Sequence, residues 1–277
     1  MTTTTITTHR TRLSDGTAVP YALAGEPGGA PVVLLHGLTD AWRSFRPLME
    51  HLPPDLRVLA STHRGHAGAD QPATGYGVAE LAEDSLAVMD EAGFERAVIV
   101  GHSLGAAIAL RLAVAHPERV AGLVLIGAFA TPTENPAVLE VAEVVDELVD
   151  PVDRDFVVEF QRSTLAHPVP EAFMDAVIAD SASVPAHVWR AALRGFLACD
   201  HLAGLGSIEV PTRLMWGDGD AFVPAEDQHT LVRHIATAEL QVVAGGGHDP
   251  HWEHPARVAG ELAEFVRATA PVAMPPH

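Results

Sequence analysis

The stretch that most constrains this chain is residues 98–110, which read VIVGHSLGAAIAL. A β-branched apolar run leads to a serine with a glycine two places before it and another two places after it, and an alanine-rich run follows. The first run is typical of a buried strand and the last of a helix. The glycines predict a sharp strand-to-helix turn that exposes the hydroxyl of Ser103, because larger residues there would collide with the sheet and the new helix.

The rest of the chain alternates between short apolar runs and helical patterns. Helical patterns lie near residues 42–51, 78–92, 104–116, 225–236 and 255–268. Runs typical of strands buried on both faces lie at 31–37, 56–61, 96–102, 120–127, 212–217 and 239–245. This alternation predicts an α/β fold with a mostly parallel sheet covered by helices on both faces. An Asp15-Gly16 turn predicts an opening hairpin that adds antiparallel strands at one edge.

One segment departs from the alternation. Residues 131–206 contain no convincing strand and several helical patterns that prolines divide into short helices. Two further strands follow this segment, so we expect it to be a helical cap inserted over the strand ends and not a tail. The expected organisation is a core domain formed by residues 1–130 and 207–277, with a cap of residues 131–206.

Composition excludes several classes of function. The chain has 17 basic and 36 acidic residues, a net charge of −19 with His neutral, and none of the basic residues is Lys. This balance argues against binding to nucleic acid or to anionic membranes. The single cysteine excludes an internal disulfide and a cysteine-based zinc cluster. With no secretory-type or membrane-length apolar run, we expect a cytoplasmic globular protein that binds a small molecule.

A serine hydroxyl becomes a good nucleophile only when a base removes its proton and an acid orients that base. His248 is the expected base for Ser103, because it follows the last predicted strand on the glycine-rich loop GGGHDPHWEHP. The acid is expected in WGDGD, after the preceding strand. There we prefer Asp220, because the chain has turned back by that point, and Asp218 is the alternative. Asp249 adjoins His248 in sequence and is therefore poorly placed to bond the same imidazole.

Attack on a carbonyl also creates an oxyanion, which backbone N–H groups stabilise by ~100-fold or more per donor. Leu104, directly after the serine, and Leu38, in the loop HGLTD, are the expected donors. His251 and His254 follow His248 at three-residue intervals. No matching carboxylates accompany them elsewhere in the sequence, so no metal site is expected.

Taken together, these segments resemble the α/β-hydrolase superfamily over nearly the whole chain. The matching pieces, in order, are HGLTDAW, HRGHAGADQP, GHSLG, WGDGD and GGGHDPHWEHP. The resemblance implies an eight-stranded, mostly parallel sheet with a helical cap and no cofactor. It supports Ser103, Asp220 and His248 as a catalytic triad, with the N–H groups of Leu38 and Leu104 as the oxyanion hole. The chain looks most like the capped, cofactor-free esterases, enol-lactonases, haloperoxidases and carbon–carbon hydrolases of this superfamily.

Some positions depart from the family pattern. Thr62 stands where the family usually has Asp, and Ala67 and Ala69 stand where it usually has Gly and Ser. These positions shape the loop near the oxyanion hole. Ser103 speaks against the dehalogenases and epoxide hydrolases of this fold, which use an aspartate nucleophile. The absence of Lys speaks against its hydroxynitrile lyases.

The expected reaction is hydrolysis of a neutral, apolar carboxylic ester or lactone through an acyl-enzyme. No arginine placement marks a clamp for a carboxylate. Ligands bind at strand ends beneath such insertions, and the expected substrate-binding residues are Phe129, Trp189, Phe173, Met174 and Phe196. Two alternatives stay open: carbon–carbon bond hydrolysis or a perhydrolase or haloperoxidase reaction by the same triad, and a ligand sensor that keeps a slow triad.

Overall fold

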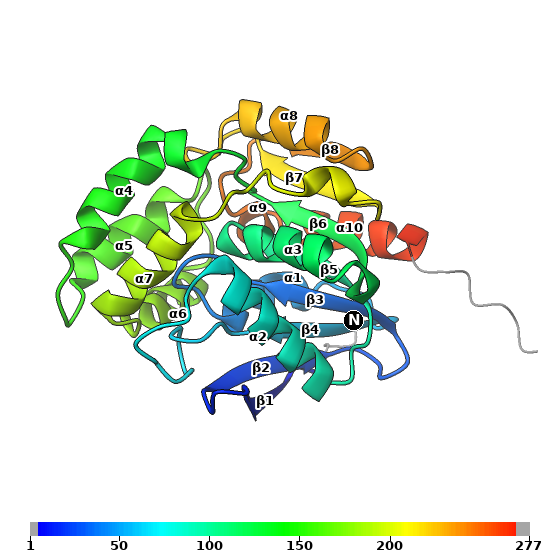
Figure 1. Cartoon of the computed structure of the whole chain (residues 1–277), viewed down its shortest axis with the longest axis horizontal. Coiled ribbons are helices and arrows are strands. Elements are labelled where there is room, and N and C mark those ends of the chain that lie inside the picture. The colour runs from blue at the N-terminus through cyan, green and yellow to red at the C-terminus, as the bar shows by residue number, and fades with distance from the viewer. Residues whose placement is uncertain (1–4, 270–277) are drawn as a thin grey trace, which may run out of the picture.

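The computed structural model describes residues 5–269, and its central feature is one eight-stranded sheet (Figure 1). The strand order is β1-β2-β4-β3-β5-β6-β7-β8, with β1 and β2 antiparallel and the strands from β4 to β8 parallel. The predicted α/β fold with a mostly parallel sheet is confirmed. The strands are β1 Thr7–Arg12, β2 Ala18–Ala24, β3 Ala30–Leu35, β4 Leu56–Ser61, β5 Ala97–His102, β6 Val120–Ile126, β7 Thr212–Gly217 and β8 Ala238–Val243.

The opening hairpin lies at one edge of the sheet, as predicted. Gly16 adopts a φ of 89° in its turn, a conformation that glycine reaches without steric cost. The first strand begins at Thr7, earlier than the predicted hairpin at residues 11–25, because Thr7, Thr8 and the two residues after them continue the extended pairing with β2.

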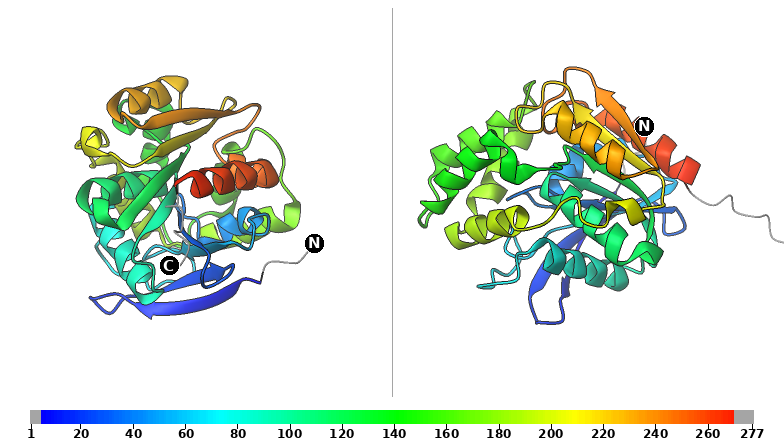
Figure 2. Two further views of the ribbon diagram at one scale, coloured as in Figure 1. Left: turned by 90° about the vertical axis from the view of Figure 1, so that its right-hand side faces the viewer. Right: turned by 45° about the horizontal axis from the view of Figure 1, so that its top comes forward.

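Helices cover both faces of the sheet, as the second set of views makes plain (Figure 2). One face carries α2 Val78–Glu91, α3 Leu104–Ala115 and α8 Ala225–His234, and the other carries α1 Arg46–Met49, α9 Pro250–Glu253 and α10 Pro255–Thr269, with the 3-10 turn Trp42–Phe45. Successive residues of β3 enter different cores: Val33 and Leu35 pack on the first face, Val32 and Leu34 on the second. This is why the central strands read as continuous apolar runs.

The segment between β6 and β7 is helical and lies beyond the carboxyl ends of the parallel strands (Figure 1). Its helices are α4 Pro136–Asp146, α5 Arg154–Ser163, α6 Glu171–Ala182 and α7 Ala186–Leu197. Proline begins or directly precedes α4, α6 and α7, where its missing N–H leaves no bond unmade. None of the helices in the described part of the chain has the length and apolar character needed to cross a membrane.

Polar contacts join this cap to the loop after β3. The Thr39 hydroxyl lies 2.8 Å from that of Ser181 on α6. Arg43 donates to both carboxylate oxygens of Asp180, with 2.8 Å between Nε and Oδ2. The cap therefore bears directly on the segment that contains Leu38.

Candidate active site

The turn between β5 and α3 has the strained geometry that the sequence predicts. Ser103 has φ 53° and ψ −115°, which a residue with a side chain adopts only when its surroundings hold it there. A Cβ on Gly101 would lie 2.1 Å from the carbonyl oxygen of Gly105, and one on Gly105 would lie 2.0 Å from that of Leu35. Both approaches are impossible for a larger residue, so the glycines are what allows helix α3 to start against the sheet.

The acid selected by turn geometry is the one that meets the histidine. Asp220 Oδ2 lies 2.9 Å from His248 Nδ1, while Asp220 Oδ1 accepts the N–H groups of Phe222 at 2.8 Å and Val223 at 2.9 Å. Asp218, the alternative, is exposed and accepts the N–H of Gly245. The carboxylate of Asp220 is thus fixed on both oxygens.

The environment of His248 combines opposing influences on its pKa. Burial of the ring favours the neutral form, but the charge and hydrogen bond of Asp220, together with the charges of Asp249 and Asp40, raise the pKa above its ordinary value. A histidine that gains a proton readily beside a fixed carboxylate has the properties of a general base.

Ser103 and His248 face one cavity of about 70 Å3, which Leu38 and Leu104 also line. Ser103 Oγ makes no hydrogen bond within residues 5–269, so proton transfer requires the serine and the histidine to come into contact, an adjustment that catalytic pairs commonly make when substrate binds. In the same residues, the N–H groups of Leu38 and Leu104 make no backbone hydrogen bond. Both donors therefore remain available to a ligand.

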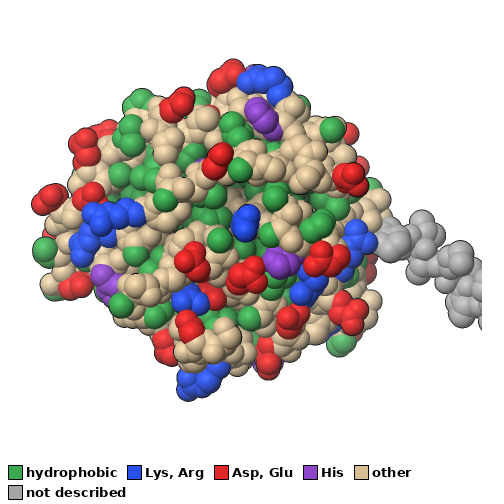
Figure 3. All heavy atoms as spheres, in the orientation of Figure 1, with side chains coloured by type: hydrophobic (Ala, Val, Ile, Leu, Met, Phe, Trp, Pro, Cys, Tyr) green, Lys and Arg blue, Asp and Glu red, His purple; other side chains and the backbone are tan. Residues whose placement is uncertain are grey.

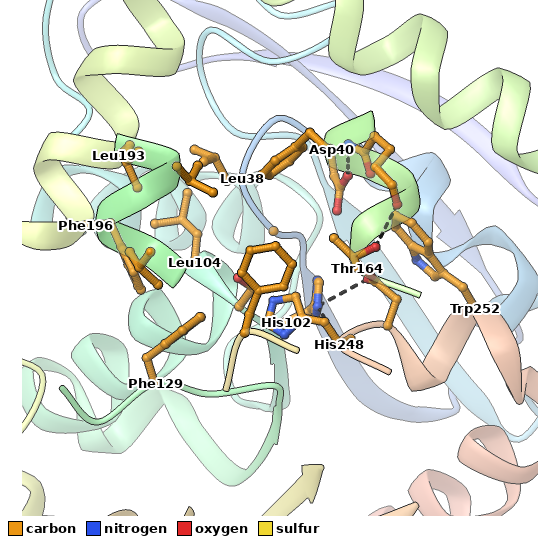
Figure 4. Close-up of a pocket in the computed structure, with 18 residues that line it drawn as sticks. Leu38, Asp40, His102, Leu104, Phe129, Thr164, Leu193, Phe196, His248 and Trp252 are labelled. Atoms are coloured by element: carbon orange, nitrogen blue, oxygen red, sulfur yellow. Dashed lines mark hydrogen bonds and ion pairs between the residues drawn. The ribbon is translucent and has the colours of Figure 1, made fainter. Parts of the chain in front are cut away.

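The cavity has two unlike ends, seen on the left and right of Figure 4 with His102 and His248 between them. We define the apolar end by Leu38, Leu104, Phe129, Leu193 and Phe196, together with Val138 and Val141 of α4, the helix that packs against α7. We define the acidic end by Asp40, Thr164 and Trp252, together with Gln161, which bonds Asp40, and Asp249, which lies beside Thr164.

Two of the five predicted substrate-binding residues line this cavity. Phe129 and Phe196 lie at its apolar end with their ring centroids 5.5 Å apart, edge to face. They come from different parts of the chain, the segment after β6 and helix α7, so the cavity is built jointly by core and cap.

The other three predicted residues, Trp189, Met174 and Phe173, do not line the cavity, and that prediction is corrected here. Trp189 is fully buried inside the cap, with its ring 5.2 Å from that of Phe160. Met174 is also buried, and Phe173 packs edge-on against Trp252 at 5.4 Å. Their apolar surface holds the cap helices together and fastens them to the core.

Sequence reasoning did not place the acidic end in the site. Gln161 and Thr164 lie one helical turn apart at the end of α5, on the side that faces the core, and Gln161 Nε2 donates to Asp40 Oδ1 at 3.3 Å. The positions of Asp40 and Asp249 in the sequence could have identified them as site residues. Each lies within a few residues of an element already expected in the site, the oxyanion loop or the base.

Asp249 is turned away from the imidazole of its neighbour, as expected. Its Oδ1 lies 3.2 Å from His102 Nε2, but that nitrogen is aligned with the carbonyl oxygen of His248 at 3.1 Å instead. Thr164 lies close by, yet its hydroxyl donates to the carbonyl of Gln161 at 2.8 Å. Neither oxygen of Asp249 has a hydrogen-bond partner among the described residues.

Both carboxyls of the acidic end hold their protons more tightly than an exposed aspartate. Burial, and then the charge of Asp249, raise the pKa of Asp40 well above its usual range. Burial raises the pKa of Asp249 to about 7, against the lowering effect of His248. Taking these groups out of water without a cation beside them disfavours the charged form.

One group of side chains has donor atoms close enough together for a metal ion. His102, Asp249 and His251 are all buried, with these atoms within 4.8 Å of one another, whereas His254 is not part of the group. Burial lowers the pKa of His251 to about 3 and keeps the ring neutral. We assign no metal here, because His102 Nε2 already has an acceptor in the carbonyl of His248.

The loop positions that depart from the family pattern are well ordered inside the fold. Thr62 accepts the N–H of Trp42 through its hydroxyl at 3.1 Å, and Ala67 and Ala69 are buried. A threonine hydroxyl thus supplies a hydrogen-bond acceptor next to the segment that follows the oxyanion loop.

A family model for the alpha/beta hydrolase fold matches residues 30–255. The chain belongs to the α/β-hydrolase family. It is 29% identical over 254 residues to 2-hydroxymuconate semialdehyde hydrolase of Pseudomonas sp. (strain CF600), covering 86% of this chain and 87% of that protein. It is 29% identical to the pimeloyl-[acyl-carrier protein] methyl ester esterase of Aromatoleum aromaticum, covering 85% and 98%.

A solved structure of an esterase from Rhodococcus sp. ECU1013 superposes on this α/β-hydrolase with a TM-score of 0.83. The two chains are 26% identical, and the match covers 95% of this chain and 99% of the other. The family, these relatives and the fold together make the chain a hydrolase.

Proposed function

We propose that this α/β-hydrolase cleaves a carboxylic ester or lactone through an acyl-enzyme formed on Ser103, with His248 as base and Asp220 as the acid that orients it. The observation that carries the proposal is the 2.9 Å hydrogen bond between His248 Nδ1 and Asp220. It holds the imidazole beside the cavity that Ser103 faces from a strained turn.

The reaction has two halves. His248 accepts the proton of Ser103 Oγ as the oxygen attacks the substrate carbonyl, and then gives that proton to the leaving alcohol. In the second half His248 takes a proton from water, the hydroxide attacks the acyl carbon, and Ser103 leaves with its proton restored. Asp220 stabilises the imidazolium in both halves. A lactone follows the same course, except that the leaving alcohol stays attached to the acyl chain.

The N–H groups of Leu38 and Leu104 supply the oxyanion hole in this proposal. Leu104 is the first residue of α3, so its N–H is one of the unpaired donors at a helix start, where the positive end of the helix dipole also lies. Two fixed donors aimed at a developing charge are the usual means of stabilising a tetrahedral intermediate.

The apolar end of the cavity supports a substrate with an apolar acyl or alcohol group. Leucine, valine and phenylalanine side chains form this end, and burying such a group gains about 25 cal/mol per Å2 of apolar surface. One relative is named a methyl ester esterase and one solved neighbour an esterase, which favours an ester bond.

A carbon–carbon bond is the second candidate. It is favoured by the similarity to 2-hydroxymuconate semialdehyde hydrolase, whose name refers to a semialdehyde and not to an ester. The same triad would attack or hydrate the ketone of a vinylogous diketone. A yellow ring-fission compound of that type loses its colour on cleavage, which separates the two candidates.

The test is a panel of chromogenic esters and lactones of graded acyl length, run on the wild type and on Ser103→Ala. We expect multiple turnover on the esters and a loss of at least about 10³-fold in kcat in the variant. Undiminished hydrolysis by Ser103→Ala would refute the covalent mechanism. Turnover of the ring-fission compound alone would select the carbon–carbon reaction.

A further inference from the structure

The charges that line the cavity have one sign. Asp40 and Asp249 line it directly, and Asp220 lies behind His248. The described lining residues include no arginine, and the chain has no lysine. Acidic side chains are also spread over the surface, with arginines among them (Figure 3), in keeping with the net charge of −19. The potential inside and outside therefore attracts cations and repels anions.

Elsewhere in the described chain, buried carboxylates have strong donors. Asp180 is held by the guanidinium of Arg43. Asp227 accepts the N–H of Ala130 at 2.9 Å and the hydroxyl of Thr131 at 3.2 Å. These partners repay the loss of hydration that burial imposes on a carboxylate.

The acidic end lacks such partners. Asp249 is 1% exposed, and both of its oxygens are without a hydrogen bond in residues 5–269. Asp40 is 3% exposed and receives one long bond from Gln161 at 3.3 Å. Unpaired buried acceptors of this kind cost free energy, so both carboxyls present unused acceptor capacity at the wall of the cavity.

We propose that the acidic end binds the ammonium group of an amine-bearing ester or lactone. The proposal rests on the proposed function, whose substrate class it narrows: the substrate has an apolar part for one end of the cavity and a cation for the other. Asp40 and Asp249 supply the countercharge. The Thr164 hydroxyl oxygen adds an acceptor, and Trp252 places an aromatic ring, a group that attracts cations, at the wall of the cavity. This replaces the expectation of a wholly neutral substrate, which took no account of these carboxyls.

The raised pKa values of the two carboxyls agree with this reading. Burial is the main cause at both residues, and neighbouring carboxylates add to it: Asp249 at Asp40, and Asp220 and Glu253 at Asp249. An ammonium beside the pair would act against both causes. Amine binding should therefore displace a proton from the pair. The other titratable groups that face the two carboxyls are Asp180, Asp220, Glu253, His102, His248 and His251.

Binding can be measured without turnover on the Ser103→Ala protein. The probes are n-hexylammonium, 1-hexanol and hexanoate, which share an apolar chain and differ in charge, titrated by calorimetry at pH 8. We expect hexylammonium to bind at least about tenfold more tightly than hexanol and hexanoate to bind most weakly. Equal or tighter binding of hexanol would overturn the proposal.

Two variants and a matched control locate the effect. Asp40→Asn and Asp249→Asn, made in the Ser103→Ala protein, should each reduce hexylammonium binding about tenfold or more and leave hexanol binding unchanged. Asp175→Asn removes the same charge from an exposed position on α6 and should change neither. If all three variants weaken the binding of hexylammonium equally, only the overall charge of the protein attracts the amine and the proposed site does not exist.

The pH dependence gives a test that needs no new variant. Hexylammonium stays protonated throughout, whereas a carboxyl with a pKa of about 7 is mostly ionised at pH 8 and mostly protonated at pH 6. Affinity should fall about tenfold from pH 8 to pH 6. The same fall in Asp249→Asn would show that Asp249 is not the group whose ionisation controls binding, and it would contradict the proposal. Ester hydrolysis by the wild type without any preference for the amine would leave the proposed function standing alone.

Discussion

Asp220 and Asp249 both adjoin His248, the first through a hydrogen bond and the second in sequence, and they are equally buried, with side chains 0% and 1% exposed. Asp220 receives hydrogen bonds on both oxygens, from His248 and from two backbone N–H groups. Asp249 receives none within the described residues. The two residues differ in the hydrogen-bond donors around them and not in how deeply they are buried. A carboxylate that the fold surrounds with donors is fixed in place to act on its neighbour. One left without them, such as Asp249, has a raised pKa and free acceptor capacity for a cation.

The largest effect expected from this comparison is on catalysis. Asp220→Asn removes the charge that orients and stabilises the imidazolium of His248, and we expect kcat to fall by about 10⁴-fold with little change in KM. Steady-state hydrolysis of the best chromogenic ester measures it.

Asp218→Asn is the control for that substitution. It changes the same residue type two positions earlier, where the carboxylate is exposed and bonds Gly245. We expect less than about a threefold change in kcat. Comparable losses in the two variants would mean that the hydrogen bond to His248 is not what assigns the acid.

The next effect concerns the stability of the fold when a carboxylate loses the arginine that pairs with it. Arg64 is 8% exposed and binds both oxygens of Asp84, at 2.5 and 2.6 Å, as well as Asp15 at 2.9 Å. Arg64→Ala leaves Asp84, whose side chain is 12% exposed, without a partner, and we expect the free energy of unfolding to fall by about 3–5 kcal/mol in urea titrations at pH 7.

The exposed pair Arg46–Glu50 provides the matched comparison. Because water already solvates both groups, Arg46→Ala should cost less than about 1 kcal/mol. A similar loss for Arg64→Ala would show that partners matter little to buried carboxylates in this fold, and it would weaken the contrast between Asp220 and Asp249.

Much of the fold can be predicted from local sequence patterns, without knowledge of tertiary contacts. The parallel strands are apolar on both faces, so runs such as 56–61 and 212–217 coincide with β4 and β7. The turn at Ser103 is equally predictable from the sequence, because steric contact with the sheet and the helix leaves room only for glycine at two fixed positions. Asp220 could be preferred over Asp218 because a two-residue difference in a turn reverses the direction of the side chain.

The residues that line the cavity were harder to predict from the sequence, since they depend on how the cap packs on the core. Helix α7 has one apolar stripe, yet Leu193 and Phe196 line the cavity while Trp189 packs inside the cap. Gln161 and Thr164 look like ordinary polar residues of α5 until the helix is placed over Asp40. Sequence patterns give the buried face of a helix but not which neighbour buries it.

The pH dependence of stability sharpens the comparison between Asp220 and Asp249 most. The pKa of Asp249 is raised to about 7 in the fold from 3.8. The folded state therefore binds the proton more tightly than the unfolded chain, and stability is greatest at low pH. The contribution of this carboxyl to the free energy of unfolding falls as the pH rises from about 4 and is fully lost above about 7. Asp249→Asn, which resembles the protonated form, removes this dependence.

Urea unfolding between pH 5 and pH 8 measures that dependence. The wild type should lose on the order of 2 kcal/mol more than Asp249→Asn over this interval, so the variant becomes the more stable protein at pH 8. Asp175→Asn, at an exposed position, should follow the wild type at every pH. If Asp249→Asn were instead destabilising at pH 8, an ionised Asp249 would have a stabilising partner in the fold. It would then be the counterpart of Asp220 and not its opposite.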